Sequence, residues 1–384
     1  MNRSYWLLPL LLGACAAPTH STGAPPGPST PPAATLEGTA PASTTAAPSA
    51  VASTTPSSTP SAAAAGALTF TMRSLPLPGA TGAVSLDYLA LDRTAGRLWI
   101  PAGGTGSVDV LTAADGKLSQ IGGFPTAERE ARGQKRVMGP SSATVGQGVV
   151  YAGSRANSDV CAIDSSKLVR ADCVRLESSP DGLQYVAATQ EVWVTTPRDK
   201  SITILDVATP LHPRSKGKLA LAGEPEGYAV DEAHGSFYTN LEDKDRTLQI
   251  DARARRVTAD WPAQCGSDGP RGLALDLARG FVLVACTDHV EVLDAAHGGA
   301  LLSKLDTGGG VDNIDYLPAS ARLYVAAGKA ARLTVAHVDD RGTLSLVGSA
   351  PTAEGARTVL AGADGTAYLV DPLHGAVLVL TPTP

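Results

Sequence analysis

The sequence has few charged and few aromatic residues, and this scarcity excludes some classes of function. Of the 384 residues, 18% are charged and 4% are aromatic, and the formal net charge is −6. Binding of nucleic acid without sequence preference needs a basic surface, and stacking on single strands needs aromatic side chains. The composition provides neither, so we expect no nucleic-acid partner. An acidic chain also lacks electrostatic attraction to anionic lipid.

The sequence also lacks the common motifs of catalysis and cofactor attachment. It contains no CxxCH, no HExxH, no GxSxG and no CxxC. These motifs mark haem attachment, zinc proteases, serine hydrolases and many zinc or redox sites. Their absence favours a non-catalytic role without a resident cofactor, and an enzyme is left as the alternative.

Long hydrophobic runs are missing, but the N-terminus carries a short one. Residues 1–15 read MNRSYWLLPLLLGAC, with a basic residue first and an apolar core too short to span a bilayer. The ending Leu-Gly-Ala-Cys15 resembles the bacterial lipobox, which implies lipidation of Cys15. Ala16 follows the cysteine, and the absence of Asp there favours the outer membrane. Cleavage at an ordinary small-residue site is the alternative.

Residues 16–66 consist almost entirely of Ala, Pro, Ser, Thr and Gly, with Glu37 as the one formally charged residue. Such a segment cannot bury enough apolar surface to offset the entropy of ordering. We therefore predict a disordered tether here, and an ordered domain over residues 67–384.

The ordered part repeats a pattern of two apolar runs separated by a polar loop. Seven copies follow one another at intervals of roughly 40 to 55 residues, without helical stretches between them. This spacing predicts an all-β, seven-bladed β-propeller with one four-stranded blade per repeat. The copies are RLWIPAGGTGSVDVLTA, VVYAGSRANSDVCAIDS, EVWVTTPRDKSITILDV, SFYTNLEDKDRTLQIDA, FVLVACTDHVEVLDA, RLYVAAGKAARLTVAHV and TAYLVDPLHGAVLVLTP.

The last repeat has room for only three strands, whereas an extra strand-like segment, residues 68–79, precedes the first repeat. We predict that this segment completes the last blade, because closure of the ring removes exposed sheet edges. The link over residues 122–138 is longer than its equivalents, and we expect either an extended loop over one face or a frayed outer strand.

Four cysteines follow Cys15, and four allow three pairings. Cys161 and Cys173 lie in adjacent strands of a predicted hairpin, near cross-strand register. Cys265 and Cys286 lie in one repeat, toward one face. We therefore favour the disulfides Cys161–Cys173 and Cys265–Cys286; free buried thiols and metal ligands are the alternatives.

Two stretches carry a resemblance to a known family. FYTNLEDKDRTLQIDA and VWVTTPRDKSITILDVAT resemble the YVTN repeat, and KRVMGPSSATVGQGVVYAGSRANSDVCAID resembles YncE-like secreted propellers. The resemblance covers residues 68–384 and implies a YVTN-repeat (YncE-like) bacterial β-propeller lipoprotein. It is specific for fold and carries little about activity. Repeats six and seven depart from it, because their third strands do not end in Asp.

In a propeller, the residue before the first strand of each blade faces the central channel, on the face that also carries the loops between second and third strands. Convergent polar groups at the mouth of such a channel predict a ligand site, with a solvated rim of mutually compensating charges as the alternative. The candidate residues are Asp87, Ser141, Asp181, Glu226, Arg271, Asp312 and Arg357, together with the loop residues His289 and His374.

The rim residues can be compared with two kinds of catalytic site found in propellers, a Ca²⁺ site and the histidine–glutamate site of lyases. Asp87, Asp181, Glu226 and Asp312 offer oxygen ligands of the kind Ca²⁺ prefers, although Arg271 in the same ring opposes a cation. Lyases of related fold need a histidine and a glutamate together. Here the two histidines of the rim are two blades apart, and neither has an evident neighbouring glutamate. His234 and His297 lie in AHG segments and are interpreted as turn residues.

The sequence therefore predicts an exported, membrane-anchored propeller at the cell envelope, monomeric, acting as a binding or interaction scaffold through its polar channel face. Its partner is an envelope protein or a small-molecule ligand. A metal-assisted hydrolase or lactonase at the channel mouth is the alternative.

Overall fold

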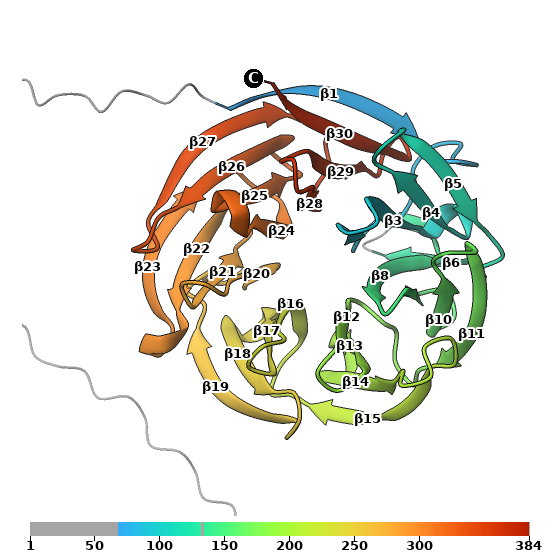
Figure 1. Ribbon diagram of the computed structural model, residues 1–384, viewed down its shortest axis with the longest axis horizontal. Coiled ribbons are helices and arrows are strands. Elements are labelled where there is room, and N and C mark those ends of the chain that lie inside the picture. The colour runs from blue at the N-terminus through green and yellow to red at the C-terminus, as the bar shows by residue number, and fades with distance from the viewer. Residues whose placement is uncertain (1–67, 132–133, 384) are drawn as a thin grey trace, which may run out of the picture. The chain divides into compact units, whose positions relative to one another are not determined.

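The computed structural model describes residues 68–131 and 134–383, and within them it is a seven-bladed β-propeller around a central channel (Figure 1). Each blade is a four-stranded antiparallel sheet, as the repeat predicts. Blade 1 consists of β2 (Ala90–Asp92), β3 (Arg97–Ala102), β4 (Ser107–Thr112) and β5 (Lys117–Ile121). Blade 2 consists of β8 (Pro140–Gly146), β9 (Val149–Ser154), β10 (Asp159–Asp164) and β11 (Val169–Arg175). Blade 3 consists of β12 (Leu183–Val186), β13 (Glu191–Thr196), β14 (Ser201–Asp206) and β15 (Arg214–Ala220).

The remaining blades follow the same order from the channel outward. Blade 4 consists of β16 (Pro225–Asp231), β17 (Ser236–Leu241), β18 (Arg246–Asp251) and β19 (Arg256–Pro262), and blade 5 of β20 (Leu273–Asp276), β21 (Phe281–Ala285), β22 (His289–Asp294) and β23 (Ala300–Asp306). Blade 6 consists of β24 (Val311–Leu317), β25 (Arg322–Ala327), β26 (Arg332–Val338) and β27 (Leu344–Pro351). Blade 7 consists of β28 (Val359–Ala361), β29 (Ala367–Asp371), β30 (Ala376–Thr383) and β1 (Thr69–Pro76). Short 3₁₀ turns occupy η1 (Gly103–Thr105), η2 (Pro197–Asp199), η3 (Glu242–Lys244), η4 (Ala295–His297) and η5 (Pro318–Ser320).

The core lies between neighbouring blades, because the second and third strands of each sheet are covered on both faces. Every residue of β13 is buried, whereas the outer strand β23 alternates between exposed and half-buried positions. Trp99 of blade 1 packs with Val150 and Ala152 of blade 2. Strands rich in Val, Leu and Ile suit this two-sided burial, and polar alternation suits the single buried face of an outer strand.

Blade 7 is built from both ends of the ordered chain, as predicted. Strand β1 pairs with β30 over eight residue pairs, from Thr69 opposite Thr383 to Pro76 opposite Ala376 (Figure 1). Leu68, just before β1, also contacts blade 6, because its backbone N–H donates to the carbonyl of Val347 in the outer strand β27. The ring therefore closes through main-chain hydrogen bonds between the two ends of the fold.

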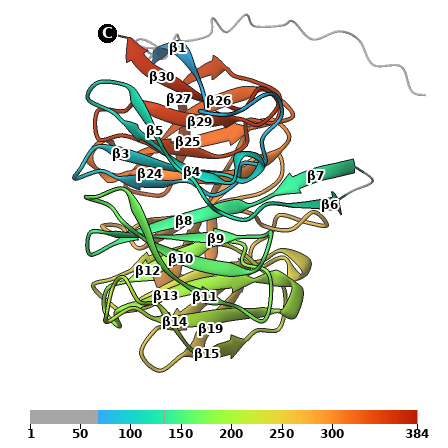
Figure 2. The ribbon, with the colours of Figure 1, turned by 90° about the vertical axis from the view of Figure 1, so that its right-hand side faces the viewer.

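The long link over residues 122–138 contains a β-hairpin, which corrects the expectation of a loop or a frayed outer strand. Outer strand β5 ends at Ile121, and β6 (Ala127–Ala131) then pairs with β7 (Gln134–Met138). Figure 2 shows this hairpin projecting from the blades. The Arg129 guanidinium donates to the carbonyl of Ala156, in the loop between β9 and β10. The hairpin thus extends from the face that carries the candidate rim.

Both predicted disulfides are present. Cys161 and Cys173 lie directly opposite each other in β10 and β11, and Cys265 is joined to Cys286 across blade 5. Cys15 and the predicted segments 1–15 and 16–66 lie outside the described residues and stay predictions. Among the residues described, no helix has the length and apolarity needed to cross a membrane.

Candidate functional site

The residues predicted to line the channel rim occupy equivalent places in successive blades. At four places around the ring, the residue after a rim residue donates its backbone N–H to the carbonyl of the rim residue in the next blade. These hydrogen bonds, 2.7 to 3.1 Å long, run from Tyr88 to Ser141, Gly227 to Arg271, Gly272 to Asp312 and Asn313 to Arg357. They hold the starts of neighbouring inner strands together at the four steps where they form.

Glycine after the rim residue permits this close approach in blade 4. A Cβ on Gly227 would lie 2.1 Å from the carbonyl oxygen of Arg271, which no side chain could tolerate. The pairs Asp181-Gly182, Glu226-Gly227 and Arg271-Gly272 repeat the same arrangement. The sequence thus combines a charged side chain for the channel with a glycine that lets the next blade approach.

Two arginines join three of the rim carboxylates into a continuous arc. Arg155, from the loop after β9, lies 2.6 Å from Asp87 and also pairs with Asp181. Arg357 lies 3.2 Å from Asp87 on the other side and 3.2 Å from Asp312. Acid and base therefore alternate across blades 3, 2, 1, 7 and 6. We refer to Asp87, Arg155, Asp181, Glu226, Asp312 and Arg357 as the channel ring.

Glu226 completes the ring on blade 4 without a cationic partner among the ion pairs of the described residues. Its carboxylate accepts a 3.5 Å hydrogen bond from the hydroxyl of Tyr88. Burial, followed by repulsion from Asp181 and Asp312, raises the pKa of Glu226 well above its ordinary value. Tyr88 lies 5.5 Å from Tyr228, centroid to centroid, so two aromatic rings support the ring of charges.

The channel ring holds four carboxyl groups and two guanidinium groups, which leaves an excess of negative charge. Burial raises the pKa of Asp181 to about 6 even though Arg155 opposes this shift, and burial likewise raises the pKa of Asp312. The pKa of Arg155 is raised by Asp181 and Asp87 against the opposing effect of burial. The carboxyl groups of the ring therefore take up protons more readily than exposed carboxyl groups, and a nearby cation would favour their ionised form.

Arg271 forms its ion pair outside the channel ring, although its charge still opposes the rise in the pKa of Asp312. Its guanidinium lies 2.5 Å from Glu242 in η3, in the neighbouring blade. The Ca²⁺ hypothesis also fits poorly, for a different reason than expected. Ca²⁺ takes six to eight oxygen ligands, whereas Arg155 and Arg357 occupy the space between Asp87, Asp181 and Asp312.

A pocket of about 320 Å³ opens beside the ring, over blades 5 to 7. Its polar walls come from Arg271, Asp312, Lys329, Glu354 and Arg357, with Leu373 as an apolar wall. A second pocket, of about 270 Å³, lies among the inner strands and is lined by Tyr88 and Tyr228 among others. The channel mouth thus offers an open pocket with charged groups of both signs.

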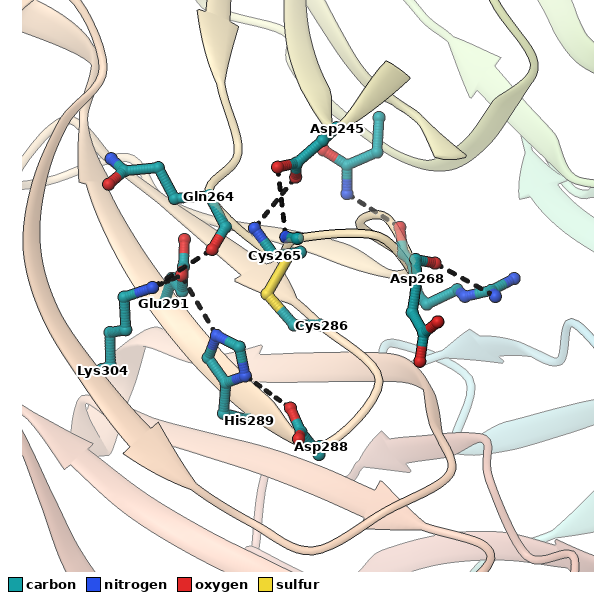
Figure 3. The surroundings of a disulfide bond; sticks show 12 residues. Asp245, Gln264, Cys265, Asp268, Cys286, Asp288, His289, Glu291 and Lys304 are labelled. Atoms are coloured by element: carbon teal, nitrogen blue, oxygen red, sulfur yellow. Dashed lines mark hydrogen bonds and ion pairs between the residues drawn. A yellow bond between two sulfur atoms is a disulfide. The ribbon is translucent and has the colours of Figure 1, made fainter. Parts of the chain in front are cut away.

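Three of the predicted rim residues lie outside the channel ring, besides Arg271. Ser141 is buried, and its hydroxyl has no hydrogen-bond partner. His374 is 76% exposed and pairs with Asp371 at 2.8 Å. His289 lies in blade 5, 3.1 Å from Glu291, so the expectation that no glutamate adjoins a rim histidine is wrong (Figure 3).

His234 and His297 behave as the turn residues they were interpreted to be. Each ring nitrogen Nδ1 lies within 2.7 Å of the aspartate three residues earlier, Asp231 or Asp294. The same aspartate accepts from the backbone N–H of its histidine.

Sequence reasoning missed Tyr88 and Tyr228 and did not assign Arg155 to the ring. A usable pattern existed for the tyrosines, because each follows a rim acid by one or two residues. Arg155 belongs to a loop rich in polar residues, and nothing in the sequence distinguishes it from its neighbours.

Comparison with known proteins supports the fold and nothing finer. No family model matches the chain, and no curated protein matches it by sequence. Hydrazine synthase of Kuenenia stuttgartiensis matches with a TM-score of 0.66 and 14% identity over 80% of this chain and 99% of that chain. The structure of streptogramin B lyase matches with a TM-score of 0.63 and 11% identity over 82% of this chain and 98% of that chain. The WD40 propeller domain of Doa1 matches with a TM-score of 0.61 and 13% identity over 80% of this chain and 96% of that chain.

Proposed function

We propose that this protein is a non-catalytic binding propeller that recognises a positively charged group through its channel mouth. The group belongs to a small ligand or to a side chain of a partner protein. The observation that carries the proposal is the channel ring itself, in which four carboxyl groups share two guanidinium groups and Glu226 has no cationic partner among the ion pairs of the described residues. The pocket of about 320 Å³ adjoins this ring through Asp312 and Arg357. An ammonium or guanidinium group that reaches the channel ring would give Glu226 a cationic partner, where its carboxyl group otherwise receives only the tyrosine hydroxyl.

The proposal includes export and a lipid anchor at Cys15, as a YncE-like lipoprotein would have, with the propeller at the outer membrane and acting as a monomer. Its support is the sequence of residues 1–66 together with two disulfides in the ordered domain. Disulfides are typical of proteins folded outside the cytosol. Metabolic labelling with palmitate tests the anchor: a Cys15→Ala variant should lose the label, and a retained label would contradict it.

A metal-assisted hydrolase or lactonase has weaker support. Guanidinium groups lie between the carboxylates that would have to share the metal. Metal analysis of the purified protein distinguishes the two functions, because stoichiometric metal lost in Asp181→Ala or Glu226→Ala would favour the hydrolase.

A site-specific photo-crosslinker tests binding at the channel mouth. Leu373 and Leu277 are similarly exposed, at 51% and 54%. Leu373 lines the pocket, whereas Leu277 follows the end of β20 that lies away from the rim residue Arg271. A crosslinker at position 373 should capture a partner or ligand, whereas one at 277 should not. The captured product should decrease strongly in Glu226→Gln and Asp181→Asn, which remove the excess charge. Equal capture from both positions, or capture that these variants leave unchanged, would contradict the proposal.

A further inference from the structure

The disulfide Cys265–Cys286 lies beside a fully buried carboxylate. Glu291, on β22, is 0% exposed, and one of its carboxylate oxygens and the two cysteine sulfurs all lie within 4.8 Å of one another. Within residues 68–131 and 134–383, no other three His, Cys, Asp or Glu side chains come so close in this way. Figure 3 shows His289 and Lys304 on the same carboxylate. We refer to Cys265, Cys286, His289, Glu291 and Lys304 as the disulfide cluster.

The two oxygens of Glu291 are treated very differently. Oε1 pairs with the ammonium group of Lys304 and with Nε2 of His289. Oε2 is buried and has no hydrogen-bond partner. An unsatisfied charged oxygen in the interior costs several times more than a neutral one, so its retention needs a reason. The disulfide itself offers no donor that would provide one.

We propose that the dithiol form of Cys265 and Cys286 holds a thiophilic divalent cation of the Zn²⁺ class, with Glu291 as the third protein ligand. Zn²⁺ binds thiolate sulfur at about 2.3 Å and carboxylate oxygen at about 2.0–2.2 Å in tetrahedral geometry. Donors around such an ion lie about 3–4 Å apart, which the present separation of at most 4.8 Å reaches with small side-chain adjustments. The fourth position would take water.

The charges of the cluster favour this occupant. Two thiolates and one carboxylate carry three negative charges, and a divalent cation with Lys304 supplies three positive charges. Lys304 and His289 remain on Oε1, where they orient the carboxylate. Hydrogen bonds of this kind to a metal ligand are a regular feature of zinc sites.

The disulfide must first be reduced, and a dithiol is the class of reductant required. One thiolate of the dithiol attacks the half-buried Cys265 sulfur, and the Cys286 sulfur leaves and takes a proton. The second thiolate of the dithiol then displaces Cys265, which takes the second proton, and the reductant becomes a disulfide. Two electrons and two protons have passed to the protein, and the metal displaces the two protons when it binds.

The second disulfide provides an internal control. Cys161 and Cys173 also lie close together, but Cys173 is exposed, and no carboxylate of the described residues completes a three-ligand group with them. Reduction of Cys161–Cys173 should therefore create two ordinary thiols without a metal site.

Cobalt is a suitable probe, because Co²⁺ reports thiolate ligation by charge-transfer absorption and tetrahedral geometry by its visible bands. The mature chain is refolded and kept in a phosphine reductant, its fold is confirmed by circular dichroism, and Co²⁺ is titrated. We expect one tetrahedral, thiolate-ligated ion per chain, displaced by Zn²⁺. Cys265→Ser should abolish it, and Glu291→Gln should weaken binding about 10- to 100-fold. The double variant Cys161→Ser/Cys173→Ser should bind as the unmodified chain does.

Several results would overturn the proposal. These are a folded, reduced chain that binds no Co²⁺, binding that survives Cys265→Ser, and binding that depends equally on Cys161. Unfolding of the chain whenever Cys265–Cys286 opens would also overturn it. If Glu291→Gln does not fold, Glu291→Asp is the second variant, because its shorter side chain moves the carboxylate oxygens away from the sulfurs while keeping their charge. Unchanged affinity for Co²⁺ in that variant would count against Glu291 as a ligand.

Discussion

The channel ring and the disulfide cluster both bury carboxylates on the same propeller, but they balance the charge differently. In the ring, four carboxyl groups share two guanidinium groups, and Glu226 has no cation. In the cluster, one carboxylate has an ammonium group and an imidazole on a single oxygen. The ring therefore lacks positive charge, whereas the cluster has enough charge and lacks a partner for one oxygen.

This difference separates two kinds of binding. A deficit of positive charge spread over several blades suits a soluble cationic group that enters from the channel mouth, or protons. A carboxylate that lies close to two sulfurs and has one unpaired oxygen suits a Lewis acid held at short distances. The following predictions test whether the two regions really differ in this way, from the largest expected effect to the smallest.

Replacement of Arg155 should have the largest effect. Arg155→Met leaves Asp87 and Asp181 without their shared cation, and breaking a buried pair of this kind costs about 3–5 kcal/mol of unfolding free energy at neutral pH. The loss should be smaller near pH 5, because the ring carboxyls can then take up protons. Urea unfolding at both pH values measures it.

Arg175→Met is the matched control for Arg155→Met, since Arg175 pairs with Asp159 but is 65% exposed. Its unfolding midpoint should stay close to that of the unmodified chain. Equal losses in the two variants would mean that the channel ring is an ordinary surface network.

Replacement of Lys304 should have the next largest effect. Lys304→Met removes the ammonium group from the fully buried Glu291, and we expect a loss of about 2 kcal/mol. His289 remains on the same oxygen and limits the loss.

Lys167→Met removes a comparable pair, with Asp164 at 3.0 Å, from the surface, where Lys167 is 73% exposed. Urea unfolding of both lysine variants provides the comparison. A Lys304 variant no less stable than the Lys167 variant would show that the charge balance of the disulfide cluster has been misread.

The raised pKa of Asp181 predicts a smaller effect that depends on pH. The folded state holds this proton up to about pH 6, whereas an unfolded aspartate releases it near its ordinary value of 3.8. Ionisation of Asp181 therefore removes stability as the pH rises from about 4 to 6. Relative to the unmodified chain, Asp181→Asn should become more stable over this interval, by about 1–3 kcal/mol.

Stability curves of both proteins against pH test this expectation, and the difference should be level above about pH 7. A difference that does not vary with pH would show that Asp181 is ionised throughout, and that the ring has no deficit of positive charge.

Replacement of His374 should have the smallest effect. His374→Ala removes an exposed turn residue that contacts neither the channel ring nor the disulfide cluster. Its unfolding midpoint and its capture of a ligand from position 373 should both match the unmodified chain. A loss of capture would extend the binding site to the loop of blade 7 and restore His374 as a ligand residue.

The propeller and its closure could be predicted from sequence because they depend on local patterns. In blade 5, the segments LALD, FVLVA, HVEVLD and ALLSKLD are the four strands as predicted. The cysteine pairs followed from the same register. At four steps of the rim, main-chain hydrogen bonds keep the equivalent residues in line, whereas their role in binding stays a prediction.

The contacts within the site could not be predicted in the same way. Arg155 and Arg271 both lie on the channel face, yet one bridges two ring carboxylates and the other turns to Glu242. The choice depends on which carboxylates long side chains from neighbouring blades can reach. The pairing of His289 with Glu291 was missed, although the alternation of a strand places these two residues on the same side of β22.

The pairing of β1 with β30 also has a mechanical consequence. The segment preceding Thr69 enters the fold at an outer strand, so a pull on that segment loads the ladder between β1 and β30 before it loads any blade interior. If the chain is held through Cys15, the seam of the ring is its first point of yield. Shear flow or traction at the envelope would then open blade 7 while the other six sheets remain paired.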